Sequence, residues 1–196
     1  MCGRYRFTEE QSREIRKIIQ DIQDKLGAEA AKSVRQGEVT PGCRMPVLVG
    51  AEEGTTPELL VWGFRTPKSM LINTRAETAL EKPTFADSAR RRHCVIPSTG
   101  FYEWDGDRRK FLFTMPDSQE VYMAGIYDVR GGVPCYSILT TAANESMRAV
   151  HDRMPLVLER GQVELWLHDL NATEPFLRMV PTMLEKEPLD AQIGLW

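Results

Sequence analysis

Apolar residues near the start of the chain recur every three or four positions, which is the spacing of one face of an α-helix. They are Ile15, Ile18, Ile19, Ile22 and Leu26. Thr8 and Gln11 form a capping-box pattern before this face, and Gly27 follows it as a typical helix stop. We therefore predict an amphipathic helix over residues 9–26.

From position 46 onward the apolar residues gather in short runs that are typical of β-strands. The predicted strands cover residues 46–49, 59–64, 94–96, 101–104, 111–114, 121–127, 134–140 and 154–158. Gly131 and Gly132 lie between two of these runs and predict a hairpin turn. Two shorter helices are predicted, one over residues 144–150 with Asn144 as its N-cap and one over residues 162–168.

Strands from distant parts of the chain, with helices around them, indicate an α+β fold. We expect residues 1–196 to form one domain with peripheral helices and a mostly antiparallel, partly closed β-sheet core that resembles a barrel. A chain of 196 residues is long enough to bury well over half of its unfolded surface. Residues 69–92 carry no predicted element, and a loop of that length is usually functional.

The composition is typical of a globular protein, with 42% apolar residues, 27% charged residues and a net charge of −3. No apolar run approaches the roughly 20 residues that span a bilayer, and no apolar segment follows the N-terminus. We therefore expect a cytoplasmic protein without a membrane segment or a secretion signal. Basic residues cluster at 4–17, 90–92 and 108–110, which fits either a phosphate-binding face or an exposed charged surface.

The cysteines are far apart and contain no CxxC pair, so they predict neither a disulfide framework nor a zinc ribbon. They are Cys2, Cys43, Cys94 and Cys135. The chain also lacks an HExxH motif. We expect no metal and no cofactor, so any thiol chemistry belongs to a single cysteine.

Cys2 becomes the first residue if Met1 is removed, as happens when the second residue is small. It then carries an α-amine with a pKa of about 7.7–8.0 beside a thiol with a pKa of about 8.5, which a neighbouring base could activate. Such an aminothiol captures an aldehyde: the amine forms an imine, and the thiol closes onto the imine carbon to give a thiazolidine. If Met1 stays, the nitrogen is an amide and this ring cannot form. A cysteine at this position can equally be an incidental small residue.

Five blocks of the sequence occur in an order that resembles one protein family. They are MCGRY at 1–5, NTRAET at 73–78, CVIP with GFYEW at 94–104, AGIY at 124–127, and TTAAN with HDRMP at 140–155. The chain resembles the SRAP family of SOS response-associated peptidases, or abasic-site processing proteins. This resemblance implies a sensor of abasic sites in single-stranded DNA that crosslinks itself to the lesion through Cys2.

Three polar residues of these blocks could assist the reaction. Opening the abasic sugar to its aldehyde requires a proton transfer, and Glu103 is the candidate because its aromatic neighbours could raise its pKa. The resemblance implies that His151 assists imine formation and its reversal, and that Asn73 holds the N-terminal residue and the sugar. Each also has an ordinary explanation: an acid at a strand edge, a structural histidine, and an asparagine in a turn.

Binding to DNA would use other residues. The resemblance implies that Arg4 and Arg75 contact phosphates beside the lesion. Trp104 could stack on a base near the abasic gap or be a core aromatic residue, and Pro41 resembles the proline-containing loop near the family's site. We expect a monomer whose partner is single-stranded DNA with abasic sites, associated with the nucleoid when bound. The activity would be crosslinking or of the lyase type.

Two other functions are compatible with the sequence. The first is a thiol peptidase or autopeptidase with Cys2 as nucleophile and His151 as base, although only Met1 precedes Cys2 and self-cleavage would release little. The second is a module that binds single-stranded DNA without reacting. The role of Cys2 separates the three functions: crosslinking and peptidase activity both need its thiol, whereas binding alone does not.

Overall fold

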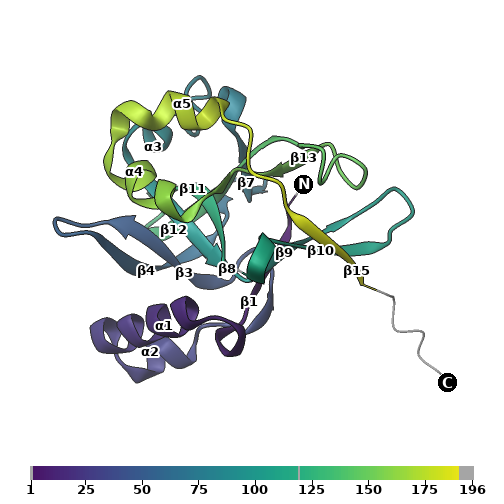
Figure 1. Ribbon diagram of the computed structural model, residues 1–196. Coiled ribbons are helices and arrows are strands. Elements are labelled where there is room, and N and C mark those ends of the chain that lie inside the picture. The colour runs from purple at the N-terminus through teal and green to yellow at the C-terminus, as the bar shows by residue number, and fades with distance from the viewer. Residues whose placement is uncertain (1, 119, 190–196) are drawn as a thin grey trace.

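The structure, a computed structural model, describes residues 2–118 and 120–189 and is built around a closed ring of five strands (Figure 1). Neighbouring strands pair antiparallel, except β12 and β4, which run parallel. In ring order the strands are β12 (Val133–Ala142), β4 (Thr55–Trp62), β3 (Arg44–Gly50), β8 (His93–Ser98) and β11 (Val121–Arg130). The predicted α+β fold with a mostly antiparallel, barrel-like sheet is therefore confirmed.

The ring strands bury side chains on both faces, because successive residues of a strand point in opposite directions. One apolar cluster joins the ring to β1 and α1, and includes Met45, Ile96 and Tyr136. The other joins the ring to α4 and α5, and includes Val95 and Leu139. With both faces covered, the ring is a rigid support for the segments that extend from it.

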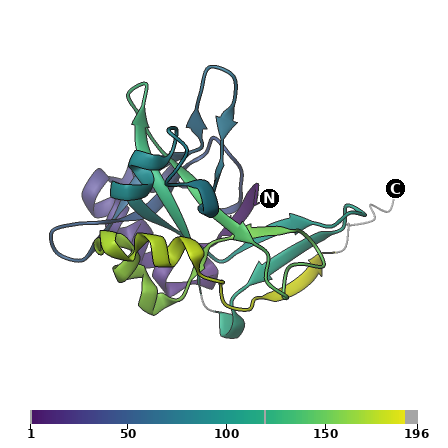
Figure 2. The same cartoon turned by 90° about the horizontal axis from the view of Figure 1, so that it is seen from above.

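A second, five-stranded sheet lies beside the ring and extends away from it (Figure 2). Its strands in order are β15 (Glu185–Leu189), β10 (Lys110–Thr114), β9 (Gly100–Trp104), β1 (Arg4–Phe7) and β2 (Gly37–Val39). Only Thr99 separates β8 from β9, so the chain passes directly from the ring into this sheet. Gly100 makes this possible: its φ is 142°, and a Cβ atom there would lie 2.7 Å from the carbonyl oxygen of Phe113.

Beyond the ring, β12 brings two further strands together. Its residues 138–140 pair in parallel with β7 (Asn73–Arg75), and its residues 140–142 pair antiparallel with β13 (Arg153–Pro155). β7 and β13 therefore meet at the same end of β12, although they are distant in the sequence. The remaining short strands are β5 (Phe64–Arg65), β6 (Met70–Leu71) and β14 (Val157–Leu158).

The helices cover the ring from two sides (Figures 1 and 2). On one side lie α1 (Arg13–Leu26) and α2 (Ala28–Lys32); on the other lie α3 (Ala86–Arg91), α4 (Val163–His168) and α5 (Thr173–Arg178). Short 3-10 turns are η1 (Glu9–Gln11), η2 (Ala76–Thr78), η3 (Pro116–Ser118), η4 (Arg160–Gln162) and η5 (Leu170–Ala172). Within residues 2–118 and 120–189, no helix is both long and apolar enough to cross a membrane.

The first helix starts later than predicted. Residues 9–11 form a 3-10 turn, and α1 begins after Ser12, whose hydroxyl accepts a hydrogen bond from the backbone N–H of Ile15 at 3.0 Å. Thr8 makes no side-chain capping bond, so the predicted capping box is wrong. The N-cap is Ser12, four residues after Thr8. Gly27 ends the helix as predicted, with a φ of 90°.

The helix predicted over residues 144–150 is also wrong, because residues 145–150 form consecutive turns. The Asn144 side chain does cap its own turn, since Oδ1 accepts from Ser146 N at 3.0 Å. Its Nδ2, however, donates to the carbonyl oxygens of Pro181 and Thr182 at 3.0 and 2.9 Å. Bonds to a distant segment therefore hold these turns in place.

Other predicted elements had mixed outcomes. The helix over 162–168 and the hairpin at Gly131 and Gly132 are confirmed by α4 and by the pairing of β11 with β12. The segment 69–92 is not a plain loop, because it contains β6, β7, η2 and α3. Elements this short bury too few residues to give a periodic pattern.

The position of the first N-cap can be tested by a matched pair of substitutions. Ser12→Ala removes the cap of α1 and a hydrogen bond to Glu120, so we expect the free energy of unfolding to fall by about 1–2 kcal/mol. Thr8→Ala should change it by less than about 0.5 kcal/mol. Urea denaturation followed by circular dichroism measures both. If Thr8→Ala lowered the free energy of unfolding more than Ser12→Ala does, Ser12 would not be the N-cap.

Candidate functional site

The N-terminal end of β1 lies where the two sheets meet, between β7 and β13 on one side and β9 on the other (Figure 1). Cys2 is completely buried there. Its carbonyl oxygen accepts a hydrogen bond from Asn73 Nδ2 at 2.9 Å, and its thiol donates to the carbonyl oxygen of Arg4 at 3.7 Å. The backbone of Cys2 is therefore fixed by a side chain from a different sheet.

Asn73 is itself held firmly by the strand on which it lies. β7 pairs with β12, with Asn73 opposite Ile138, and the hydroxyl of the next residue, Thr74, lies 2.9 Å from that of Ser137. The Oδ1 atom of Asn73 is buried and has no hydrogen-bond partner within the described part of the chain. One end of this amide thus anchors Cys2, while the other end can accept a hydrogen bond from an amine or a ligand hydroxyl.

Glu103 reaches the site from β9. The pairing of Arg4 with Tyr102 aligns this strand with the N-terminal end of β1, and Glu103 is only 4% exposed. Burial of the Cys2 thiol, reinforced by the negative charge of Glu103, raises the pKa of Cys2 far above its ordinary value. The sequence suggested an activated thiol, but its surroundings keep it protonated.

His151 follows the turns of residues 145–150 and lies two residues before the start of β13. Its Nδ1 accepts a hydrogen bond from the backbone N–H of Arg153 at 2.9 Å when the ring is neutral. The carboxylate of Asp152 lies equally close, 2.9 Å from the same nitrogen, and can accept from it when the ring is protonated. Each protonation state therefore has a partner, as a group that takes up and returns a proton requires.

Arg153 and Glu77 connect the two segments that flank β12 on the same side of the site, and the sequence indicated no role for either residue. The guanidinium of Arg153 donates to Glu77 Oε2 at 2.8 Å and to the carbonyl oxygen of Thr140 at 2.6 Å. The same guanidinium lowers the pKa of Glu77. This ion pair joins η2, the turn directly after β7, to β13. Both residues stand in the family-like blocks, but nothing in the sequence shows that they meet.

The candidate DNA-binding residues surround this position. Arg4 lies near Trp104, with its Cζ atom 5.5 Å from the ring centroid. Arg75 is exposed at the end of β7, two residues after Asn73. Pro41 is half-buried in the turn after β2, and the pairing of β2 with β1 brings that turn alongside the N-terminal end of the chain. The structure thus places all four at or beside the junction of the sheets.

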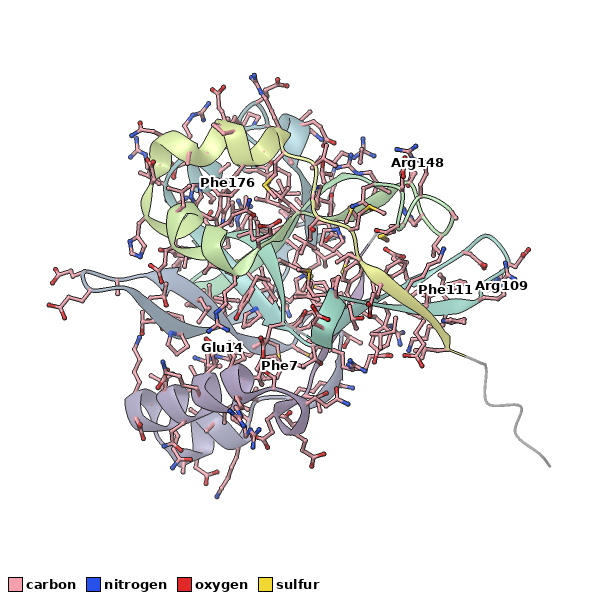
Figure 3. The ribbon with its side chains drawn as sticks, viewed as in Figure 1. Phe7, Glu14, Arg109, Phe111, Arg148 and Phe176 are labelled. Carbon is pink, nitrogen blue, oxygen red and sulfur yellow. The ribbon has the colours of Figure 1, made fainter. Side chains whose placement is uncertain are left out.

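Figure 3 labels two arginines, of which Arg109 lies at the outer tip of the hairpin between β9 and β10, away from the junction. Arg148 lies on the turn segment before His151. Both are exposed, although Arg109 is paired with Asp105 at 2.7 Å. Arg148 was not singled out from the sequence because it is an isolated charge.

The run of arginines at 90–92 has a different role. Arg90 donates to the carbonyl oxygen of Leu80 at 2.8 Å, and Arg92 donates to that of Tyr127 at 3.1 Å and pairs with Asp87. These contacts hold α3 against the ring. Arg90 and Arg92 are therefore structural links, whereas the sequence left open whether the run bound DNA or was merely exposed.

A metal centre has no ligand set in the described part of the chain, where no three His, Cys, Asp or Glu residues are grouped to hold an ion. The four cysteines are free thiols. The functional groups at the site are therefore the buried thiol of Cys2, the fixed amide of Asn73, the buried carboxylate of Glu103 and the imidazole of His151.

The state of the Cys2 thiol can be tested by alkylation. A raised pKa means less thiolate at any pH below it, and burial adds a steric barrier. We expect iodoacetamide at about pH 8 to modify the partly exposed Cys43 at least about tenfold faster than Cys2 in the folded protein. Peptide mass spectrometry measures both sites, and in denaturant the two rates should converge. Faster reaction at Cys2 would show that the thiol is activated after all.

Two solved structures have the same fold. A protein from Bacteroides thetaiotaomicron superposes with a TM-score of 0.78 at 22% identity, covering 96% of this chain and 92% of that protein. A protein from Bordetella bronchiseptica superposes with a TM-score of 0.74 at 20% identity, covering 97% of this chain and 100% of the other. These similarities support the fold.

Sequence relatives extend over nearly the whole chain. It is 28% identical to the abasic site processing protein YoaM of Bacillus subtilis, over 97% of this chain and 89% of that protein. It is 27% identical to the abasic site processing protein YedK of Escherichia coli, over 85% and 79% of the two chains. A sequence model described as SOS response associated peptidase (SRAP) matches residues 1–193. The chain therefore belongs to the SRAP family.

Proposed function

We propose that this protein recognises abasic sites in single-stranded DNA and forms a thiazolidine crosslink through Cys2 after removal of Met1. The observation that carries this proposal is the hydrogen bond from Asn73 to the carbonyl oxygen of Cys2, because it fixes the backbone of the residue that would react. Glu103 and His151 come from the two sides of the same junction. The names of the relatives, abasic site processing proteins, support the choice of substrate.

The proposed reaction forms a C–N and a C–S bond and releases one water. The protein has to assist only with proton transfers. Glu103 assists the opening of the sugar ring to its aldehyde. The α-amine of Cys2 adds to the aldehyde carbon, and loss of water, assisted by His151, gives a protonated imine. Sγ then bonds to the imine carbon, the thiol proton leaves, and the nitrogen keeps the electron pair of the former double bond. The product is a five-membered ring that contains both heteroatoms of Cys2.

The raised pKa of Cys2 is compatible with this order of events. A protonated imine is strongly electrophilic, so a neutral thiol close to it can add without prior formation of a thiolate. A thiol peptidase instead attacks a weakly electrophilic amide and depends on a thiolate or on a base that generates one. The burial of Cys2 therefore favours crosslinking over the peptidase alternative.

Removal of Met1 is an essential part of the proposal. It converts the amide nitrogen of Cys2 into an amine and takes away the residue bonded to it. Cys2 is fully buried, but the next residue, Gly3, and its hydrogen-bond partner, Asn73, are each partly exposed, so the molecular surface lies close to it.

The DNA strand would follow the charged and aromatic residues around the junction. In the proposal, Arg4 and Arg75 contact phosphates on the two sides of the lesion, and Trp104 stacks against a neighbouring base. The turn with Pro41 borders this path. We propose a monomer that acts in the cytoplasm and is associated with the nucleoid when bound to DNA.

The crosslink itself is the first test. Incubation with an abasic single-stranded oligonucleotide should give an adduct that survives denaturing electrophoresis, and the fraction crosslinked should match the fraction that lacks Met1 by intact mass. Cys2→Ala should abolish the stable adduct, because the ring needs the thiol. Cys43→Ala should retain it.

The outcomes separate the alternative functions. An unreacted mixture of Met1-free protein and abasic DNA at neutral pH would refute the proposal. Turnover of a peptide that is lost in Cys2→Ala would support the peptidase. Full affinity for DNA in Cys2→Ala, with no adduct in either protein, would point to a binding module.

The role of Glu103 predicts a kinetic effect. Glu103→Gln keeps the size of the side chain but cannot donate or accept the proton, so crosslinking should slow by about 10²-fold. Affinity for an undamaged oligonucleotide, measured by fluorescence anisotropy, should stay within about twofold, as expected for a change in proton transfer alone. Glu52→Gln, at an exposed turn between β3 and β4, is the matched control and should react as the wild type. Equal rates for the two variants would remove Glu103 from the mechanism.

A further inference from the structure

The outer face of the five-stranded sheet carries a group of charged and aromatic residues that the crosslinking chemistry does not use. We call it the outer patch. Its members are Arg4, Glu38, Tyr102, Trp104 and Lys110. They come from four adjacent strands, and backbone pairing places Arg4 opposite Tyr102 and Lys110 opposite Trp104. Arg4 is two residues from Cys2, so the patch adjoins the reactive end of the chain.

The cations of the outer patch lie over its rings. The Nζ atom of Lys110 is 4.0 Å from the centroid of Tyr102 and 5.4 Å from that of Trp104. The guanidinium of Arg4 is 5.5 Å from the Trp104 centroid. Rings with a cation beside them are a combination that binds nucleotides, because a base can stack on the ring while the cation meets the phosphate.

In the free protein both cations are bound to the same carboxylate. Glu38 forms ion pairs with Arg4 and with Lys110. Burial tends to raise the pKa of Glu38, but the hydrogen bonds from Lys110 and Arg4 outweigh it and hold the pKa below its ordinary value. Glu38 is therefore an anion at neutral pH, and the three charges sum to +1.

Arg4 and Lys110 can exchange their ion pairs with Glu38 for ion pairs with an external anion. The side chains of Arg4, Glu38 and Lys110 are 46%, 27% and 28% exposed. Ion pairs this close to solvent are worth little, so an incoming phosphate that offers more charge can compete with them. The carboxylate and a phosphate need the same donors, and one replaces the other without a change in the backbone.

We propose that the outer patch is a nucleotide subsite for the DNA strand leading away from Cys2, and that Glu38 holds the place of a phosphate until DNA arrives. The proposal rests on the DNA-binding function proposed above, and its new elements are Lys110, Tyr102 and Glu38. Arg4 and Lys110 move from Glu38 to the phosphodiester, the adjacent base stacks on the partly exposed Trp104, and the buried ring of Tyr102 supports Lys110. Glu38 thereby weakens binding to undamaged strands, so that lasting attachment depends on reaction at Cys2.

Binding of an undamaged oligothymidylate at several salt concentrations tests this proposal. Glu38→Gln removes the competing charge while keeping the side chain's size, so we expect about three- to tenfold tighter binding at low salt. The plot of log K against log salt should become steeper by about 0.7, the contribution of one phosphate contact on a single strand. Lys110→Gln should weaken binding and make the plot shallower by a similar amount. Fluorescence anisotropy provides both quantities.

The matched control is Glu29→Gln on α2, which makes the same change of net charge at an exposed ion pair with Lys32. α2 lies on the opposite side of the molecule from the hairpin between β9 and β10 (Figure 1). If Glu29→Gln and Glu38→Gln change affinity and salt dependence equally, the effect is one of net charge and the subsite is refuted. Unchanged binding in Lys110→Gln would refute it as well.

The same experiment distinguishes this proposal from the one on which it rests. If the wild type crosslinks abasic DNA but Glu38→Gln binds undamaged DNA as the wild type does, the subsite fails and the crosslinking function stands. If the wild type neither binds nor crosslinks single-stranded DNA, both proposals fail.

Discussion

The double pairing of β12 is the constraint on which the rest of the site depends. Its first half closes the ring by pairing with β11 and β4, and its second half carries β7 on one edge and β13 on the other. Since both flanking strands are only three residues long, neither would persist without this template. One rigid strand therefore positions both segments. It brings Asn73 to the same place as His151 and Arg153.

The environment at that place determines which chemistry suits Cys2. A buried thiol beside a buried carboxylate is held in its neutral form, which is unfavourable for attack on an amide but adequate for closing a ring on an adjacent imine. The α-amine that the proposed removal of Met1 would give needs no activation by that environment, because the pKa of an α-amino group is already close to neutrality. His151 can be stabilised in both of its protonation states. The site thus combines the fixed backbone of Cys2 with groups suited to the proton transfers of the proposed reaction.

Most of the described charges near the site are engaged with other parts of the protein. Arg153 binds Glu77, and Arg4 shares Glu38 with Lys110. A chain with a net charge of −3 has no general attraction for a polyanion, so the proposed binding of DNA would rest on a few local cations. Competition between internal carboxylates and DNA phosphates would keep that attraction weak until the covalent step.

The sequence by itself determined the type of fold, the strands of the ring and the helix before Gly27, and it singled out Cys2 as the candidate reactive residue. These follow from apolar periodicity and from short motifs, which are local properties. Only the tertiary structure decided where α1 begins, that residues 145–150 are turns, that β7 and β15 are strands, and that Cys2 is fully buried. The tertiary structure alone also decided that Arg153 pairs with Glu77 and that two cations share Glu38. Each of these features depends on partners far away in the chain, and burial, pKa and pairing are set by the groups that surround a residue in space.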